Sequence, residues 1–208
     1  MLLSRLPLLQ VFRHLLPFPP DPAVPAMQRV ALEAVIAAPN VTWGPLRVVT
    51  THLEYYSALQ RAAQVEFLRE LQALGHRHAV APRSDAETDP PFAVLPRGEF
   101  AVFCGDFNCP AGAPEHARMQ AAIAPDVPRL VDAWSIAYPA APTDDAGAAV
   151  AVPPAPTFCV HDRGYLGQPA CYDFFFVSAN LAERVASVAV DGACTASDHQ
   201  PIWLELTG

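Results

Sequence analysis

The chain has 208 residues, 52% of them hydrophobic and 16% charged, which suits one folded domain and excludes a disordered protein. Its formal net charge of −8 and the lack of a basic run argue against a general nucleic-acid binder, because contacts with phosphate groups dominate such binding. A nuclease with a local basic groove is still compatible with this composition.

The first half of the chain predicts two strands followed by a helix. Residues 28–36 place apolar side chains at alternate positions, and residues 46–53 form a run rich in β-branched side chains that is typical of a buried strand. Ser57 and Gln60 have the spacing of a capping box, which predicts a helix start, and Gly75 predicts its end. Apolar residues recur along this helix at Leu59, Ala63, Phe67, Leu71 and Leu74.

The second half of the chain mixes both kinds of element. Helices are predicted at residues 113–124 and, from a weaker pattern, at residues 130–138. Strands are predicted at residues 100–104, 172–177, 184–190 and 201–206. Strands and helices mixed along the whole chain indicate an α/β or α+β protein with a substantial sheet.

Two segments, residues 79–98 and 139–156, are rich in proline and are typical of exposed linkers. Chemical motifs fall on both sides of each, so we interpret residues 1–208 as a single domain. The five cysteines are an odd number and form no CxxC motif, so we expect small apolar core residues of a cytoplasmic protein. No apolar run approaches the about 20 residues that cross a membrane.

The segment Gly105-Asp106-Phe107-Asn108 directly follows the strand predicted at residues 100–104. Asp106 and Asn108 are two residues apart, so they project in a similar direction if the chain stays extended. A carboxylate can orient or deprotonate a water molecule, and an amide can donate to a phosphoryl oxygen. The same residue types also form an Asx turn at the end of a strand, and the tetrapeptide alone fits both interpretations.

A second polar motif, Ser197-Asp198-His199, precedes the last predicted strand. Neighbouring side chains on an extended segment point in opposite directions, so we do not expect Asp198 and His199 to bond to each other. Asp173 is the candidate partner of His199, because an unpaired carboxylate in an otherwise apolar strand is costly. The pair is either a catalytic dyad or a structural ion pair. His52, at the end of a predicted strand, is more often structural when considered alone.

In this order and spacing the motifs resemble the endonuclease/exonuclease/phosphatase superfamily. It includes the deoxyribonuclease I-like and exonuclease III-like enzymes, neutral sphingomyelinases and inositol polyphosphate 5-phosphatases. The resemblance covers nearly the whole chain. It is carried by Ser4-Arg5-Leu6-Pro7, Thr51-His52-Leu53 with Arg61 and Gln64, Gly105-Asp106-Phe107-Asn108, Tyr172-Asp173-Phe174 and Ser197-Asp198-His199.

The resemblance implies a four-layer sandwich of two packed mixed β-sheets flanked by helices, with the site at one end. Asp106 would orient or deprotonate the attacking water, and Asn108 would hold that water or a phosphate oxygen. His52 and His199 would contact the phosphate and stabilise its developing charge, with Asp173 fixing His199.

The resemblance also implies a hard divalent cation, Mg²⁺ or Mn²⁺, with Asp198 beside it. In the family, an Asn and a Glu that is the main metal ligand come before the Ser-Arg-Leu-Pro segment. This chain begins at that segment, and Glu33 and Glu54 sit in the wrong place to replace the Glu. Residues 1–18 therefore look like an internal strand and loop, and we expect a domain that is truncated at its N-terminus, with an open core face.

We therefore predict a divalent-metal-dependent hydrolase of phosphodiesters or phosphomonoesters that uses in-line attack by an activated water. The alternative is a catalytically inactive or partner-completed binding module that kept the fold but lacks the main metal-binding Glu. A third interpretation is a fragment that does not fold alone. Nucleic acid, a phospholipid headgroup and a phosphoinositide all fit as substrates. No stable membrane insertion is predicted, because no lipid-inserting amphipathic helix is evident, and the sequence predicts no oligomeric state.

Overall fold

A computed structural model describes residues 1–38, 41, 43–82, 93–140, 151–164 and 167–208. The middle parts of both predicted linkers, residues 83–92 and 141–150, lie outside these described residues. Within the described part, no helix is long and apolar enough to cross a membrane.

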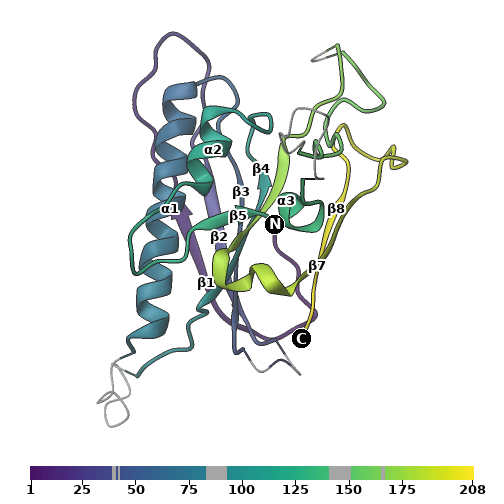
Figure 1. The fold of residues 1–208 in the computed structure, drawn as a ribbon. Coiled ribbons are helices and arrows are strands. Elements are labelled where there is room, and N and C mark those ends of the chain that lie inside the picture. The colour runs from purple at the N-terminus through teal and green to yellow at the C-terminus, as the bar shows by residue number, and fades with distance from the viewer. Residues whose placement is uncertain (39–40, 42, 83–92, 141–150, 165–166) are drawn as a thin grey trace, which may run out of the picture.

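A mixed six-stranded sheet forms the centre of the molecule (Figure 1). All neighbouring strands in it run antiparallel except β3 and β4, which run parallel and are connected through a long helix. In spatial order the strands are β1 (Leu8–Leu15), β2 (Val30–Ile36), β3 (Leu46–His52), β4 (Phe100–Asp106), β6 (Asp173–Ser178) and β5 (Leu130–Asp132). A second, antiparallel sheet pairs β7 (Val185–Val190) with β8 (Ile202–Leu206).

The remaining elements lie on the two faces of the central sheet. Helices α1 (Ala58–Val80) and α2 (Pro114–Gln120) cover one face, and the β7–β8 sheet lies on the other side (Figure 1). A short helix α3 (Ala133–Ala137) and the 3-10 helix η3 (Ala179–Arg184) lie beside the β5–β6 edge. This arrangement confirms the predicted mixed α/β class, with two sheets flanked by helices.

Two apolar cores explain why the central strands are hydrophobic on both faces. Phe103 on β4 and Phe176 on β6 point into the core beneath α1 and α2. Their neighbours Val102 and Val177 point into the core shared with the β7–β8 sheet. Because successive side chains of a strand alternate between faces, a strand buried on both faces has a nearly continuous apolar run.

Helix α1 begins where the sequence predicted, because the Ser57 Oγ accepts a hydrogen bond from the Gln60 backbone N–H at 3.1 Å. The predicted end at Gly75 is wrong, since the helix continues to Val80. A Cβ at position 75 would lie 1.7 Å from the Arg47 Nη1 atom, so this glycine makes room for a buried arginine instead of ending the helix.

The predicted apolar face of α1 is also wrong in part. Leu59 and Leu74 are exposed, and several polar side chains take the buried positions. These polar side chains donate to backbone carbonyls of neighbouring loops and of the end of α2: Gln60 to Pro19, Gln64 to Pro17, Arg69 to Arg118 and Ala121, and Gln72 to Pro128. The helix therefore anchors loops through buried hydrogen bonds, which a pattern of hydrophobicity does not reveal.

Other boundaries shift for local reasons. The segment predicted as a helix at residues 130–138 divides into β5 and α3, because Asp132 Oδ1 accepts the Trp134 N–H at 2.9 Å and starts the helix there. The helix predicted at residues 113–124 is confined to α2. The strand predicted at residues 100–104 continues to Asp106, so this carboxylate belongs to the sheet itself.

Strand β1 lies at the edge of the central sheet and confirms that residues 1–18 contain a strand. His14 faces α1, where its ring lies 6.1 Å from that of Phe67. Val11 and Leu15 have the opposite parity and are exposed, as is Val30 beside Leu15 on β2. An open apolar face is thus present, while the truncation of the domain stays a prediction.

Candidate active site

Three of the predicted site residues form one row across the central sheet. His52 on β3 is the register partner of Asp106 on β4, and Asp106 is the register partner of Asp173 on β6. Directly opposed residues of neighbouring strands place their side chains on the same face, so the three groups share one end of one face. Residues from distant parts of the sequence are brought together by strand pairing.

Gly105 allows this row to form. Its φ is +130°, a conformation that side-chain-bearing residues rarely adopt, and a Cβ there would lie 1.9 Å from the Thr51 carbonyl oxygen. The pairing continues past the strand end, because Leu53 N–H donates to the Asp106 carbonyl at 2.9 Å. The glycine that the sequence singled out is therefore required for the close approach of β3 and β4.

The Asp106 carboxylate is the point on which two imidazoles converge. Its Oδ2 lies 3.4 Å from His52 Nε2 and 3.8 Å from His199 Nε2. Its Oδ1 accepts the backbone N–H of Asn108 at 2.8 Å. Burial, together with the charge of Asp173, raises the pKa of the Asp106 carboxyl to about 6, which is suitable for a general base near neutral pH.

The predicted contact between Asp173 and His199 is present, with Asp173 Oδ2 2.8 Å from His199 Nδ1. Because a carboxylate only accepts, the imidazole Nδ1 carries the proton and Nε2 is the nitrogen turned towards Asp106. The hydrogen bond to Asp173 raises the pKa of His199, and the charges of Asp173 and Asp106 raise it further. The other side of the imidazole packs against Phe158, whose ring centroid lies 4.6 Å away.

The two histidines have opposite electrostatic environments. Partial desolvation lowers the pKa of His52, whose side chain is 56% exposed, and the positive charges of Arg29 and His199 lower it further. Compared with an ordinary histidine, the neutral form is therefore favoured at His52 and the imidazolium at His199. Beside one carboxylate, a neutral imidazole can accept a proton, and a charged imidazole can stabilise a negative charge.

Asn108 does not continue the strand as an extended residue. Its φ is +50°, and the bond from its N–H to Asp106 Oδ1 closes a turn. Of the two interpretations that the sequence left open for this segment, the structure therefore contains the Asx turn and not the extended chain. The Asn108 Nδ2 donates to the Leu53 carbonyl at 2.8 Å, so part of this amide links the β4 turn to the end of β3.

Asp198 stands apart from the other predicted site residues. Its carboxylate accepts a hydrogen bond from Ser197 Oγ at 3.2 Å, and its side chain is exposed. Among the described residues, no hydrogen bond or ion pair connects this carboxylate to the row of His52, Asp106 and Asp173. The same part of the chain contains no group of three His, Cys, Asp or Glu side chains that could hold a metal ion.

Both glutamates that the sequence analysis set aside have protein partners. Glu33 is buried against His14 at 2.7 Å and Arg47 at 3.7 Å. Glu54 is buried in the loop after β3 and accepts from Arg29 Nε at 3.3 Å, as well as from the backbone N–H groups of Met27, Tyr55 and Tyr56. Although burial alone would raise the pKa of Glu54, these hydrogen bonds hold it below its usual value.

Arg61 and Gln64 secure the same loop. Arg61 Nη1 donates to the carbonyls of Glu54 and Tyr55 at 3.0 Å, and its Nε lies 3.0 Å from Glu115. Gln64 Oε1 accepts the Glu54 N–H at 2.9 Å. These residues of the His52 motif thus hold the loop that follows the histidine.

Arg29 was missed by the sequence analysis. It directly precedes β2, and its charge acts on both His52 and Asp106. Glu54 holds its Nε, while within the described residues its two Nη groups have no hydrogen-bond acceptor. One basic residue before a strand gives no pattern in the sequence, so only the fold reveals a cation at this site.

All five cysteines are free. Burial raises the pKa of Cys104 to about 11 and that of Cys109 and Cys171 to about 12. These three thiols therefore stay protonated near neutral pH and lack the thiolate form that acts as a nucleophile or metal ligand. The prediction of core residues is confirmed for Cys109 and Cys159, which are buried.

Solved structures of known proteins share this fold. An endonuclease/exonuclease/phosphatase from Bacteroides vulgatus superposes with a TM-score of 0.61 at 19% identity, covering 97% of this chain and 66% of that one. A mannosyl-6-phosphatase from Bacteroides thetaiotaomicron superposes with a TM-score of 0.60 at 16% identity, covering 97% and 67%. A 3′ phosphatase from Neisseria bound to a product DNA hairpin gives 0.55 at 19% identity, covering 99% and 73%.

At these identities the structures establish the fold alone, and the chain spans about two thirds of the length of the first two. No curated protein sequence matches the chain. The model of the Endonuclease/Exonuclease/phosphatase family, however, matches residues 1–199. This match covers the row of His52, Asp106 and Asp173 as well as His199. The chain therefore belongs to the endonuclease/exonuclease/phosphatase family.

Proposed function

We propose that this chain carries the catalytic groups of a phosphoesterase in which water attacks phosphorus and Asp106 acts as the general base. The convergence of His52 and His199 on the Asp106 carboxylate is the observation that carries the proposal. Family membership makes hydrolysis of a phosphate ester the reaction class. A carboxyl group with a pKa of about 6 is largely ionised at neutral pH and can accept the proton of the attacking water.

The neighbouring groups have complementary roles in this proposal. The His199 imidazolium donates from Nε2 to a non-bridging phosphoryl oxygen, and Asp173 holds the ring and its charge. His52 in its neutral form contacts the phosphate or the attacking water. Arg29 supplies a fixed positive charge and two Nη groups that have no acceptor in the described part of the chain and can donate to the phosphate anion. The proton of water moves to Asp106, the new P–O bond forms, and the bond from phosphorus to the leaving oxygen breaks.

Metal dependence stays a prediction. Magnesium takes about six oxygen ligands, usually one or two carboxylates with water and substrate phosphates. The described residues do not form such a centre on their own, because Asp198 lies outside the cluster and no three candidate ligands meet. Asp198 is the residue that we propose to lie beside a bound Mg²⁺ or Mn²⁺, which would stabilise negative charge on the phosphate.

The substrate is proposed only as a class, a phosphate mono- or diester such as a nucleic acid, a phospholipid headgroup or a phosphoinositide. The mannosyl-6-phosphatase and the 3′ phosphatase among the structural neighbours both act on phosphate esters, as their names state. The alternative is a non-catalytic or partner-completed phosphate-binding module. It is favoured by the lack of a three-ligand metal cluster in the described chain.

A matched pair of chromogenic esters tests the proposal. The 208-residue protein is assayed with p-nitrophenyl phosphate and bis(p-nitrophenyl) phosphate, each with Mg²⁺, with Mn²⁺ and with EDTA. Turnover that disappears in Asp106→Asn supports the hydrolase. The rates of the unmodified protein on the two esters show whether the monoester or the diester is preferred. Binding of inorganic phosphate without turnover of either ester supports the binding module. Turnover that survives Asp106→Asn would contradict the assigned base.

A further inference from the structure

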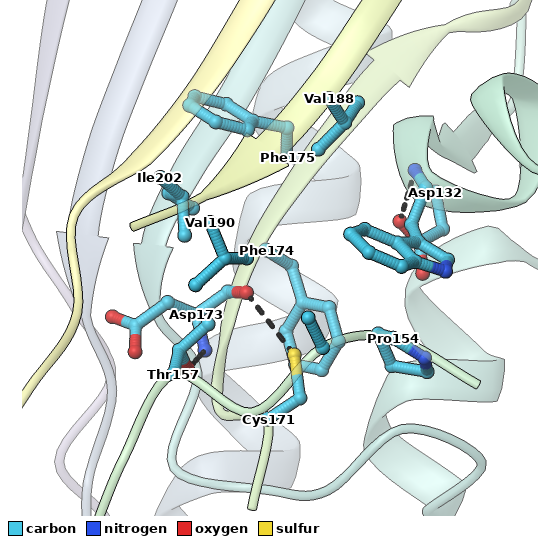
Figure 2. A pocket seen from close by; sticks show the side chains of 12 residues that line it. Asp132, Pro154, Thr157, Cys171, Asp173, Phe174, Phe175, Val188, Val190 and Ile202 are labelled. Atoms are coloured by element: carbon cyan, nitrogen blue, oxygen red, sulfur yellow. Dashed lines mark hydrogen bonds between the residues drawn. The ribbon is translucent and has the colours of Figure 1, made fainter. Parts of the chain in front are cut away.

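Thr157 lies at the junction between the two partners of the histidine–carboxylate pair. It is 1% exposed, and its Oγ1 accepts hydrogen bonds from the backbone N–H groups of Tyr172 at 3.0 Å and Asp173 at 3.1 Å. Figure 2 shows Thr157 beside Asp173 at one edge of a pocket whose other walls are largely apolar. One hydroxyl thus holds the backbone at the point where β6 begins.

The backbone of Thr157 holds the second partner. Its carbonyl accepts the N–H of Gln200, the residue after His199, at 2.6 Å, and its own N–H donates to the Ala170 carbonyl at 2.9 Å. The next residue, Phe158, forms an isolated β-bridge with His199 and packs its ring against the imidazole. Thr157 is therefore connected to the backbone on both sides of the Asp173–His199 hydrogen bond.

Packing alone does not explain why residue 157 carries a hydroxyl group. Phe174, Val190 and Ile202 line the same pocket, so the equally sized side chain of valine would suit the apolar walls. A buried hydroxyl is favourable only where its hydrogen bonds replace those with water. Here it accepts two backbone donors, and one of them belongs to the residue that orients His199.

We propose that Thr157 is a positioning residue of the phosphoesterase, which holds Asp173 and the backbone beside His199 at hydrogen-bonding distance from each other. The inference rests on the proposed function. A displacement of about 1 Å at a catalytic group costs about 100-fold in rate. Loss of the Thr157 hydroxyl is therefore expected to act on turnover and not on substrate binding.

Three variants separate positioning from general stability. Thr157→Val keeps the shape and removes the acceptor, whereas Thr157→Ser keeps the hydroxyl. Ser178→Ala is the matched control, because Ser178 is fully buried at the opposite end of β6 and its Oγ also accepts a backbone N–H, that of Ala101, at 3.0 Å. If Thr157→Val does not fold, Thr157→Ala takes its place, since it leaves space for a water molecule.

The kinetic readout is the separation of kcat from KM on whichever of the two nitrophenyl esters is turned over. Thr157→Val is expected to lower kcat by about 10- to 100-fold with KM changed less than about threefold. Thr157→Ser should retain kcat within about threefold, and Ser178→Ala should lose thermal stability while retaining kcat. Equal losses of kcat in Thr157→Val and Ser178→Ala, or a normal kcat in Thr157→Val, would overturn the proposal.

A second readout does not depend on activity. The proton on His199 Nδ1 is expected to give a downfield NMR resonance at low temperature, assigned by its absence in His199→Gln. It should persist in Thr157→Ser and Ser178→Ala and disappear in Thr157→Val. If the wild-type protein turns over neither ester, the proposed function fails and this resonance alone decides the role of Thr157. An unchanged resonance in Thr157→Val would refute that role.

Discussion

The Asp106 carboxylate lies 3.4 Å from His52 Nε2, and these two residues are register partners in the single parallel strand pair of the described sheet. The pairing of β3 with β4 therefore sets the distance between them, with little freedom left to loops. A site built on paired strands is held more rigidly than one built on loops.

Replacing the proposed base should separate activity from stability. Asp106→Asn is expected to lower kcat by about 100- to 10,000-fold, because an amide cannot accept the proton of water. The same change should stabilise the fold at pH 7.5. The pKa of Asp106 is raised from 3.8 unfolded to about 6 folded, so stability is lost as pH rises through this window and the ionised carboxylate is unfavourable above it. Urea unfolding at pH 5 and pH 7.5 measures the gain, which should be larger at pH 7.5.

The pH dependence of kcat/KM should be bell-shaped. Activity is expected to rise as pH increases through about 6, where Asp106 ionises. It is expected to fall again at a pH above the ordinary pKa of histidine, because Asp173 raises the pKa of His199. In Asp173→Asn the falling limb should move to lower pH. An optimum that lies several pH units higher, with no change of slope near pH 6, would contradict the assignment of Asp106 as base.

Asp173→Asn should lower kcat by about 100-fold or more, because an amide has no negative charge to stabilise the imidazolium and can turn its NH2 donor towards Nδ1, so that the tautomer and charge of His199 are no longer fixed. The protein contains a matched control in another histidine–carboxylate pair, in which His116 Nε2 and Asp132 Oδ2 are 3.0 Å apart. Asp132→Asn should cost stability and leave kcat near that of the wild type. Steady-state kinetics and thermal unfolding of both variants distinguish a catalytic pair from a structural one, and equal kinetic losses would indicate a structural role for both.

The sequence predicted the chemistry of the site better than its geometry. The partnership of Asp173 with His199 could be inferred, because a lone carboxylate in an apolar strand needs a partner. The row formed by His52, Asp106 and Asp173 could not be inferred from the residues alone. It depends on the register between strands that are about 50 residues or more apart, and a shift of one residue would turn every side chain to the other face.

The features that the sequence did not predict also depend on contacts formed only in the folded chain. Gly75 was interpreted as a helix end because glycine favours such positions, but tertiary packing of Arg47 requires the missing side chain there. The tetrapeptide around Asn108 fitted both an extended segment and an Asx turn, and the structure contains the turn, in which the Asn108 N–H donates to Asp106. Arg29 and Thr157 lie next to strands or in an irregular segment, where no periodic pattern marks a residue as important. Each acts through contacts with residues distant in sequence.

Gly105→Ala tests the close approach of β3 and β4. The new Cβ would lie 1.9 Å from the Thr51 carbonyl oxygen at a φ of +130°, so the backbone must shift. We expect a loss of at least about 3 kcal/mol in the free energy of unfolding, from strain together with displaced strands. Gly112→Ala is the control, because its φ is +82° and its Cβ would meet open space. It should cost about 1 kcal/mol, and similar unfolding midpoints for the two variants would contradict the argument.

Removing the cation at the site should weaken substrate binding. Arg29→Ala is expected to raise KM about 10-fold, which corresponds to about 1.4 kcal/mol of lost charge-assisted binding. Because the charge of Arg29 lowers the pKa of both Asp106 and His52, its removal should also move the rising limb of the pH profile to higher pH. Arg77→Ala is the control, because it changes the net charge by the same amount. Arg77 is exposed and pairs with Asp126, and it lies about 30 Å along α1 from the start of that helix. If Arg77→Ala raised KM as much as Arg29→Ala, the effect would come from net charge and not from a cation whose charge acts on His52 and Asp106.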